Sequence, residues 1–137
     1  MNLPDGLLAL LKKPSPCFIT TIMADGSPQQ STLVWVDTDG EHILINTVAT
    51  HQKVRNVERD PRVSVAVLDL EQPSKYYSVR GRVVAMSAKG AVEHINTLAQ
   101  RYMGKPYPWL DGPTGNRLLL TIKADKVYPD WTTVRAT

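Results

Sequence analysis

The chain reads CFITTIMADGSPQQSTLVWV from Cys17 to Val36, and this stretch decides the fold class. It contains two runs rich in β-branched residues, 17–23 and 31–36, on either side of a turn that holds Asp25 and Gly26. β-branched residues favour strands, and an Asp-Gly pair between two such runs is typical of a β-hairpin. The stretch therefore predicts two antiparallel strands.

Strand-like segments continue along most of the chain. A turn at 37–40 leads into a third predicted strand, 41–47, which we expect to extend the hairpin into a meander. Further β-rich runs follow; they cover residues 62–68, 75–86 and 117–127. Sequential strands with turns between them predict a mainly antiparallel sheet.

Three segments predict helices at the flanks of this sheet. A short helix begins near Pro4 and ends before Pro14, a second covers 51–59 and ends at Asp60-Pro61, and the third covers 91–103 with Gly104 as its stop. Residues 105–115 are rich in proline and glycine and predict a loop. Helices segregated from an antiparallel sheet give an α+β or closed-barrel class, not a doubly wound parallel sheet.

Length and composition indicate one soluble domain, residues 1–137. The apolar runs are too short to cross a bilayer and the N-terminus lacks the pattern of a signal peptide, so we expect a cytoplasmic protein with no membrane partner. Cys17 is the single cysteine, and we expect it to be a small buried apolar residue. The net charge of +3 favours an anionic partner without selecting one.

Several kinds of chemistry have no signature in the sequence. The motifs of dinucleotide-binding proteins, P-loop proteins, serine hydrolases and zinc proteases are absent. The three histidines are scattered, so no metal site is expected. Asp37 and Asp39 sit at a turn, where we expect them to serve local backbone hydrogen bonds. Aromatic residues do not interleave with the basic ones, so no nucleic-acid partner is expected.

Two polar segments remain as a candidate site. One runs from Gln29 to Thr32 along a strand, and the other runs from Thr47 to Lys53, from a strand end into a helix. Backbone N–H groups, hydroxyls and the Lys53 ammonium at such a junction can converge on one phosphate. The alternative is a solvated helix whose basic face meets only water, and the pattern alone leaves both interpretations open.

Three segments carry a resemblance to a known family: DGSPQQSTLVW from Asp25, KVRNVERDPRVS from Lys53, and YYSVRGRV from Tyr76. Together with Asn46-Thr47, they resemble the pyridoxamine 5'-phosphate oxidase-like split-barrel family, and within it most closely the deazaflavin oxidoreductases that use coenzyme F-420. The resemblance implies a six- to seven-stranded antiparallel split β-barrel, an FMN-binding split barrel, with flanking helices.

The resemblance also implies a homodimer with a cofactor site at each interface, built from both chains. It places three residues along the cofactor on the second strand: Gln30, Ser31 and Thr32. Around the phosphate it places Thr47, His51, Gln52 and Lys53, with Asn56 following on the helix. Tyr76 and Ser78 match the strand that reaches the partner's cofactor, although plain aromatic packing is an alternative for Tyr76. No catalytic residue is assigned.

Departures from the family pattern bear on the cofactor. Pyridoxamine 5'-phosphate oxidases carry arginines where this chain has Ser31 and Gln52, and residues 133–137 lack their arginine and histidine pattern. The second of these differences argues against vitamin B6 chemistry. Two lost charge-assisted contacts would weaken FMN binding by roughly a hundredfold or more. The expected cofactor is therefore coenzyme F-420, with FMN as the alternative.

The resemblance implies an oxidoreductase that transfers a hydride between F-420 and a small, largely apolar organic substrate. The cofactor would hold the reactive carbon, which explains why no acid–base motif is present. We expect the substrate to stack near Trp35, Tyr76 or residues 107–109, with Trp109 and Trp131 as further candidates. The alternatives are an FMN-dependent enzyme of the same fold and a non-catalytic flavin- or deazaflavin-binding protein.

Overall fold

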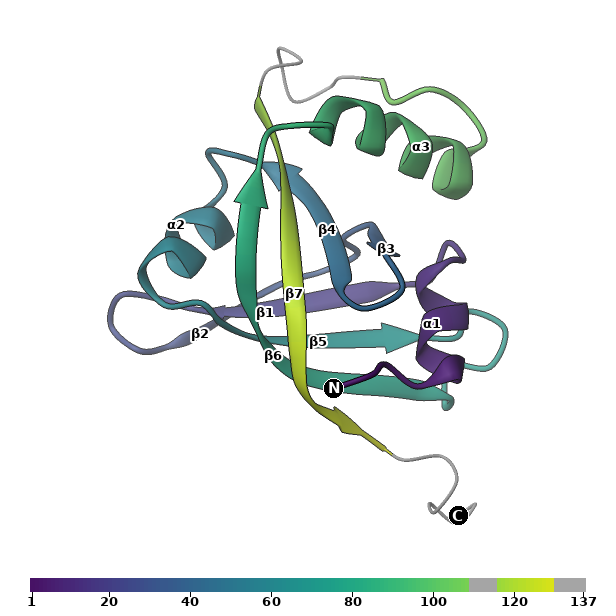
Figure 1. The fold of residues 1–137 in the computed structure, drawn as a ribbon, viewed down its shortest axis with the longest axis horizontal. Coiled ribbons are helices and arrows are strands. Elements are labelled where there is room, and N and C mark those ends of the chain that lie inside the picture. The colour runs from purple at the N-terminus through teal and green to yellow at the C-terminus, as the bar shows by residue number, and fades with distance from the viewer. Residues whose placement is uncertain (109–115, 130–137) are drawn as a thin grey trace.

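The computed structural model describes residues 1–108 and 116–129 (Figure 1). In these ranges, seven strands form one curled antiparallel sheet with three helices at its flanks, which is the predicted split barrel. The elements, in chain order, are α1 (Asp5–Leu11), β1 (Cys17–Ile22), β2 (Pro28–Ser31), β3 (Val36–Thr38), β4 (Ile43–Val48), α2 (Gln52–Arg59), β5 (Arg62–Leu68), β6 (Tyr76–Ser87), α3 (Ala91–Met103) and β7 (Arg117–Tyr128).

The order of the strands across the sheet is β2-β1-β5-β6-β7-β4-β3, and every neighbouring pair is antiparallel. The two edge strands, β2 and β3, are therefore consecutive in the chain. Six strand spacings of about 4.8 Å would separate the edges of a flat sheet by roughly 29 Å. The chain from Ser31 to Val36 reaches at most about 18 Å. The sheet must curl for the chain to pass from one edge to the other.

The prediction of a single strand over 31–36 is wrong, and so is the prediction that the next strand extends the hairpin into a meander. The β1–β2 hairpin forms as predicted, with Ile22 opposite Pro28. Residues 32–35 then leave the sheet, and Leu33 adopts a φ of 55°, which extended backbone does not tolerate. β4 consequently pairs with β3 and β7 and not with β2. We call residues 32–35 the crossover.

The core lies inside the curl of the sheet and beneath α1. Leu7 and Leu11 of α1 are fully buried, and β1 alternates buried and half-buried residues as a strand with one covered face should. Cys17 is also fully buried, and burial raises the pKa of its thiol to about 12. The prediction of a small buried cysteine is therefore confirmed.

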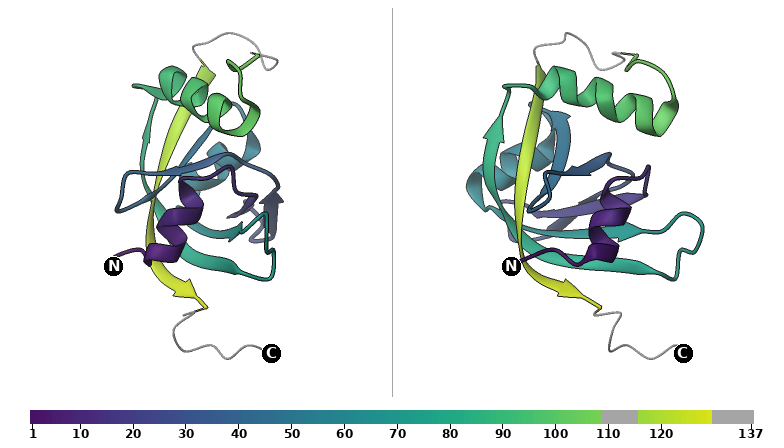
Figure 2. Two further views of the ribbon diagram at one scale, coloured as in Figure 1. Left: turned by 90° about the vertical axis from the view of Figure 1, so that its right-hand side faces the viewer. Right: turned by 45° about the vertical axis from the view of Figure 1, so that its right-hand side comes forward.

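The helices begin and end close to the predicted residues. α2 buries the expected apolar edge, Val54 and Val57, and contacts β1. α3 contacts β4 and β7 and ends at Gly104, whose φ of 73° suits a glycine stop. The turned views show α3 at the top of the barrel with α1 below it (Figure 2), and Arg101 of α3 donates to the Leu11 carbonyl of α1 at 3.3 Å. Nowhere in 1–108 or 116–129 does a helix have the length and hydropathy that crossing a membrane requires.

Gly81 lies where β6 passes close to the backbone of β7. A register shift follows Arg80, and a Cβ atom at position 81 would collide with the Lys123 carbonyl group. Because the obstacle is backbone, Gly81→Ala should lower the free energy of unfolding by about 1–3 kcal/mol, measured by denaturant unfolding. Val84→Thr, at an exposed position on the same strand, is the control and should change it by less than about 0.5 kcal/mol. Equal stability of wild type and Gly81→Ala would show that the two strands separate without cost.

Candidate functional site

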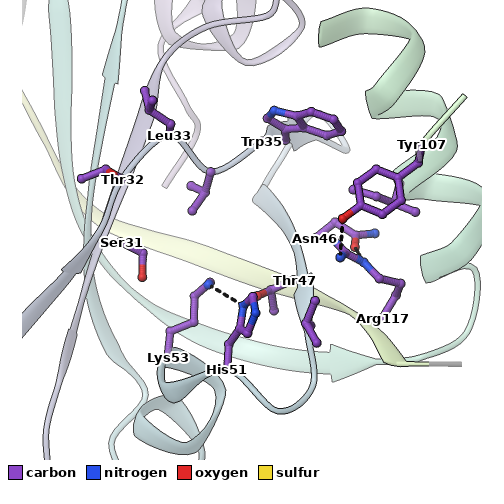
Figure 3. Close-up of a pocket in the computed structure, with 13 residues that line it drawn as sticks. Ser31, Thr32, Leu33, Trp35, Asn46, Thr47, His51, Lys53, Tyr107 and Arg117 are labelled. Atoms are coloured by element: carbon purple, nitrogen blue, oxygen red, sulfur yellow. Dashed lines mark hydrogen bonds between the residues drawn. The ribbon is translucent and has the colours of Figure 1, made fainter. Parts of the chain in front are cut away.

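A pocket of about 300 Å³ opens where the crossover faces the end of β4 and the start of α2 (Figure 3). Its wall is completed by α3, by Tyr107 and by the first residue of β7. The lining residues are Ser31, Thr32, Leu33, Val34, Trp35, Asn46, Thr47, Val48, His51, Lys53, Ile95, Tyr107 and Arg117. The pocket thus joins segments from most of the chain, and the crossover supplies Thr32 to Trp35.

Half of the predicted site residues line this pocket: Ser31, Thr32, Thr47, His51 and Lys53. Figure 3 shows the Ser31 hydroxyl and the Lys53 ammonium on the same side of the pocket, beside His51. The predicted phosphate-binding junction and the predicted strand therefore meet in space. Substrate candidates Trp35 and Tyr107 also line the pocket, whereas Trp109 and Trp131 lie outside the described residues.

The other predicted residues lie elsewhere. Gln30 is exposed on β2 and does not line the pocket, and Tyr76 and Ser78 lie on β6, outside it. The Gln52 amide donates to Asn56 Oδ1 at 2.9 Å. Asn56 is fully buried and donates to Thr21 Oγ1 at 2.9 Å, so its amide attaches α2 to β1.

Lys53 is half-buried at the start of α2. Its Nζ lies 3.3 Å from Nδ1 of His51, which in turn lies 3.5 Å from the Thr47 hydroxyl. Burial lowers the pKa of Lys53, and the positive charge of Arg117 lowers it further. The ammonium group is therefore partly desolvated and lies close to a second cation. Both the desolvation and the like charge favour binding of an anion beside it.

Sequence reasoning missed Arg117 and Asn46. Arg117 is 6% exposed, its Nε donates to Asn46 Oδ1 at 2.9 Å, and its guanidinium carbon lies 5.1 Å from the centre of the Tyr107 ring. Trp35 meets the edge of Tyr107 at 5.9 Å and stacks on Tyr102 at 5.1 Å. This end of the pocket combines a buried cation with aromatic walls.

A hydrogen-bonded series continues from Asn46 away from the pocket. Asn46 Nδ2 donates to the Ala91 carbonyl at 2.8 Å and lies 3.2 Å from His94 Nδ1. His94 Nε2 lies 3.0 Å from Asp37 Oδ2, and Arg101 donates to Asp37 Oδ1 at 3.1 Å. Asp37 thus joins β3 to α3, and it also accepts the predicted local backbone hydrogen bond, from Thr38. The neighbouring Asp39 likewise accepts local backbone hydrogen bonds, as expected.

Comparison with known sequences gives the family. The sequence model of pyridoxamine 5'-phosphate oxidase matches residues 3–129. The chain belongs to the pyridoxamine 5'-phosphate oxidase family. The match extends from the start of the chain to the end of β7 and so includes every segment that lines the pocket.

Solved structures with this family's fold include an F-420 reductase, which is 26% identical at a TM-score of 0.79; the alignment covers 91% of this chain and 98% of that one. A conserved hypothetical protein from Mycobacterium tuberculosis has a TM-score of 0.68 at 22% identity, with 98% and 91% covered. General Stress Protein 26 from Bacillus anthracis has a TM-score of 0.64 at 17% identity, with 88% and 87% covered. The last two show the shared fold alone.

The charged side chains known to line the pocket are all positive. Among residues 1–108 and 116–129, those that line it include the cations Lys53 and Arg117 and no aspartate or glutamate. Low-dielectric walls strengthen the field of such a cluster. The pocket is therefore suited to an anionic ligand with a planar, apolar part.

Asp37 should make stability depend on pH. Burial raises the pKa of its carboxyl group, but hydrogen bonds from His94, Thr38 and Arg101 outweigh that effect and lower the pKa from 3.8 to about 2. A group whose pKa is lower in the folded chain stabilises the fold above its unfolded pKa and loses that effect as the pH falls through its folded pKa. The ionised carboxylate should stabilise the fold at pH 7 and stop doing so between about pH 4 and pH 2.

Asp37→Asn should therefore lower the free energy of unfolding at pH 7 by about 1–2 kcal/mol, after allowance for solvent screening at a partly exposed group. The difference from wild type should shrink between about pH 4 and pH 2. Denaturant unfolding at a series of pH values measures both effects. Asp125→Asn removes an exposed ion pair with Arg82 and is the control, expected to have little effect. A pH-independent difference at Asp37 would contradict the assignment.

Proposed function

We propose that the chain binds the phosphate of a flavin-type cofactor in this pocket and exchanges a hydride between that cofactor and a small organic substrate. The observation that carries the proposal is the half-buried Lys53 ammonium in a pocket that has no acidic lining residue in the described part of the chain. The proposal assigns the cofactor as coenzyme F-420, with FMN as the alternative.

The donor set at the Lys53 end suits a phosphate. The hydroxyls of Ser31, Thr32 and Thr47 line the same pocket as the ammonium group, and α2 begins at Gln52, so the positive end of its dipole lies nearby. Charge-assisted hydrogen bonds from a lysine and hydroxyl donors are the usual partners of a phosphate oxygen. A phosphate here would also offset the effects that lower the Lys53 pKa.

The likeness to an F-420 reductase, at 26% identity, supports the deazaflavin over FMN. The position of Ser31 supports it as well, because a hydroxyl in place of the family's arginine makes one fewer ionic contact to an FMN phosphate. Ring position would be set by the aromatic walls, Trp35 and Tyr107, which are held by their contacts with each other.

The bound cofactor would supply the hydride-carrying carbon. The chain would supply orientation and an environment from which water is excluded. Trp35 stacks on Tyr102, and Ile95 adds an apolar surface on the same pocket. Such rigid apolar walls place a planar reactant at low entropic cost. The substrate we propose is accordingly small and largely apolar.

Lys53→Ala should weaken binding of F-420 and of FMN by about ten- to a hundredfold, because one charge-assisted contact is lost. Tryptophan fluorescence titration of the purified protein measures the affinity. Lys89→Ala removes an exposed lysine outside the pocket and is the matched control, expected to bind as wild type does. Unchanged affinity in Lys53→Ala, with normal affinity in the control, would exclude this phosphate site.

We further propose a homodimer in which Tyr76 and Ser78 of one chain complete the site of the other. A pocket of about 300 Å³ lies at the small end of ligand sites, which supports a second chain as the missing wall. Lys53→Ala and Tyr76→Ala should each bind poorly alone. When the two variants are refolded together, random pairing makes about half of the dimers mixed, and each mixed dimer has one intact site of its two. About a quarter of the wild-type number of sites should therefore return. No recovery in a mixture that dimerises would exclude the shared site.

A further inference from the structure

Arg117 is held in the pocket wall by the Asn46 amide and by Tyr107, whose hydroxyl accepts from its Nη1 at 3.4 Å. Its Nε donates to Asn46 Oδ1 at 2.9 Å, and both side chains are nearly fully buried. Figure 3 shows the guanidinium group on the side of the pocket opposite Ser31, between Asn46 and Tyr107. The bond from its Nε–H exists only while the oxygen of the Asn46 amide faces Arg117.

The Asn46 amide is held in one orientation by two acceptors. Its Nδ2 donates to the Ala91 carbonyl and points at His94 Nδ1. A reversed amide would bring its oxygen to the Ala91 carbonyl oxygen and its NH₂ to the Arg117 N–H. Both contacts would then be repulsive, so the reversed amide is unfavourable.

His94 can accept from Asn46 only when its own ring proton is on Nε2. That nitrogen lies 3.0 Å from Asp37 Oδ2, and the Asp37 carboxylate is an acceptor that Arg101 holds from its other oxygen. Asp37 therefore selects the tautomer of His94, and His94 selects the orientation of Asn46. The Asn46 oxygen then holds the Nε–H of Arg117, whose Nη1 is held by Tyr107.

We propose that Arg117 is a second anion-binding residue of the pocket, and that His94 and Asn46 are positioning residues that hold its guanidinium group there. The inference rests on the proposed function, because the anion is the phosphorylated end of the cofactor. Lys53 and Arg117 then bind its negative charge from two sides.

The electrostatics of the pocket support a shared anion. The charge of Arg117 reaches Lys53, since it contributes to the lowered Lys53 pKa after burial. Two like charges in a poorly solvated pocket repel each other, and an anion between them converts that repulsion into two attractions. A phosphate also accepts two parallel hydrogen bonds from a fixed guanidinium group, which a flexible one forms at greater entropic cost.

Three substitutions at His94 separate the positioning role from simple packing. Asn places an amide oxygen near the position of Nδ1 and keeps an acceptor for Asn46. Gln reaches the position of Nε2 instead, and Phe keeps the ring volume with no hydrogen bond. We expect His94→Asn to bind FMN within about twofold of wild type, and His94→Gln and His94→Phe to bind it about three- to tenfold more weakly.

Riboflavin, which has the same ring system without the phosphate, distinguishes lost anion binding from general damage. In His94→Phe the affinity for FMN should fall while that for riboflavin stays unchanged. Arg117→Met should show the same selective loss, and adding His94→Phe to it should cause no further loss, because His94 acts through Arg117. Equal losses for both ligands, additive losses, or a His94→Asn variant as weak as His94→Phe would each overturn the inference.

Inorganic phosphate tests Arg117 without a flavin. Its titration should shift the nuclear magnetic resonance signal of the Arg117 Nε–H in wild type and less in His94→Phe. A signal that does not move overturns the second anion-binding residue even where flavins bind. A moving signal in a protein that binds neither FMN nor F-420 supports Arg117 and refutes the proposed cofactor instead, so the two proposals fail separately.

Discussion

The chain passes between the two edges of a seven-stranded sheet within four residues, and the rest of the structure depends on that constraint. So short a connection cannot span a flat sheet, so the strands must curl until β2 and β3 approach each other. The curl creates the core beneath α1, and it also brings the end of β4 and the start of α2 to face the crossover. The pocket is a direct geometric result of barrel closure.

The positive side chains of the pocket are kept apart from the nearby carboxylate of Asp37 by the side chains packed between them. Lys53 and Arg117 line the cavity. The carboxylate of Asp37 lies at the far end of the hydrogen-bonded series that runs through Asn46 and His94, and it is paired with Arg101. The carboxylate can therefore fix the geometry of the wall without lying among the residues that line the pocket. Such an arrangement keeps the cavity attractive to anions although the chain as a whole carries a net charge of only +3.

Local patterns in the sequence predicted the local structure. Three local signals were decisive, and each acts over a few residues: the Asp25-Gly26 turn, the proline after α2 and the glycine after α3. The hairpin and the two helices that these signals delimit are all present. The sheet order was not predictable in this way, because the β-branched run over 31–36 reads as one strand unless the edges it must join are known. The junction at Lys53 was recognised since strand end and helix start are adjacent in the chain. Arg117 was missed because it enters the pocket through the pairing of β7 with β4, opposite Val48, and no local signal encodes that register.

The crossover lines the ligand pocket but does not take part in the strand pairing that forms the barrel. Residues 32–35 form one wall of the cavity, yet they belong to no strand ladder. Substitutions there can reshape the cavity while the seven strands keep their pairing. In evolution, a lineage with this arrangement can acquire new ligand preferences through the exposed positions Thr32 and Leu33, whereas Val34 packs against the core and Trp35 stacks on Tyr102.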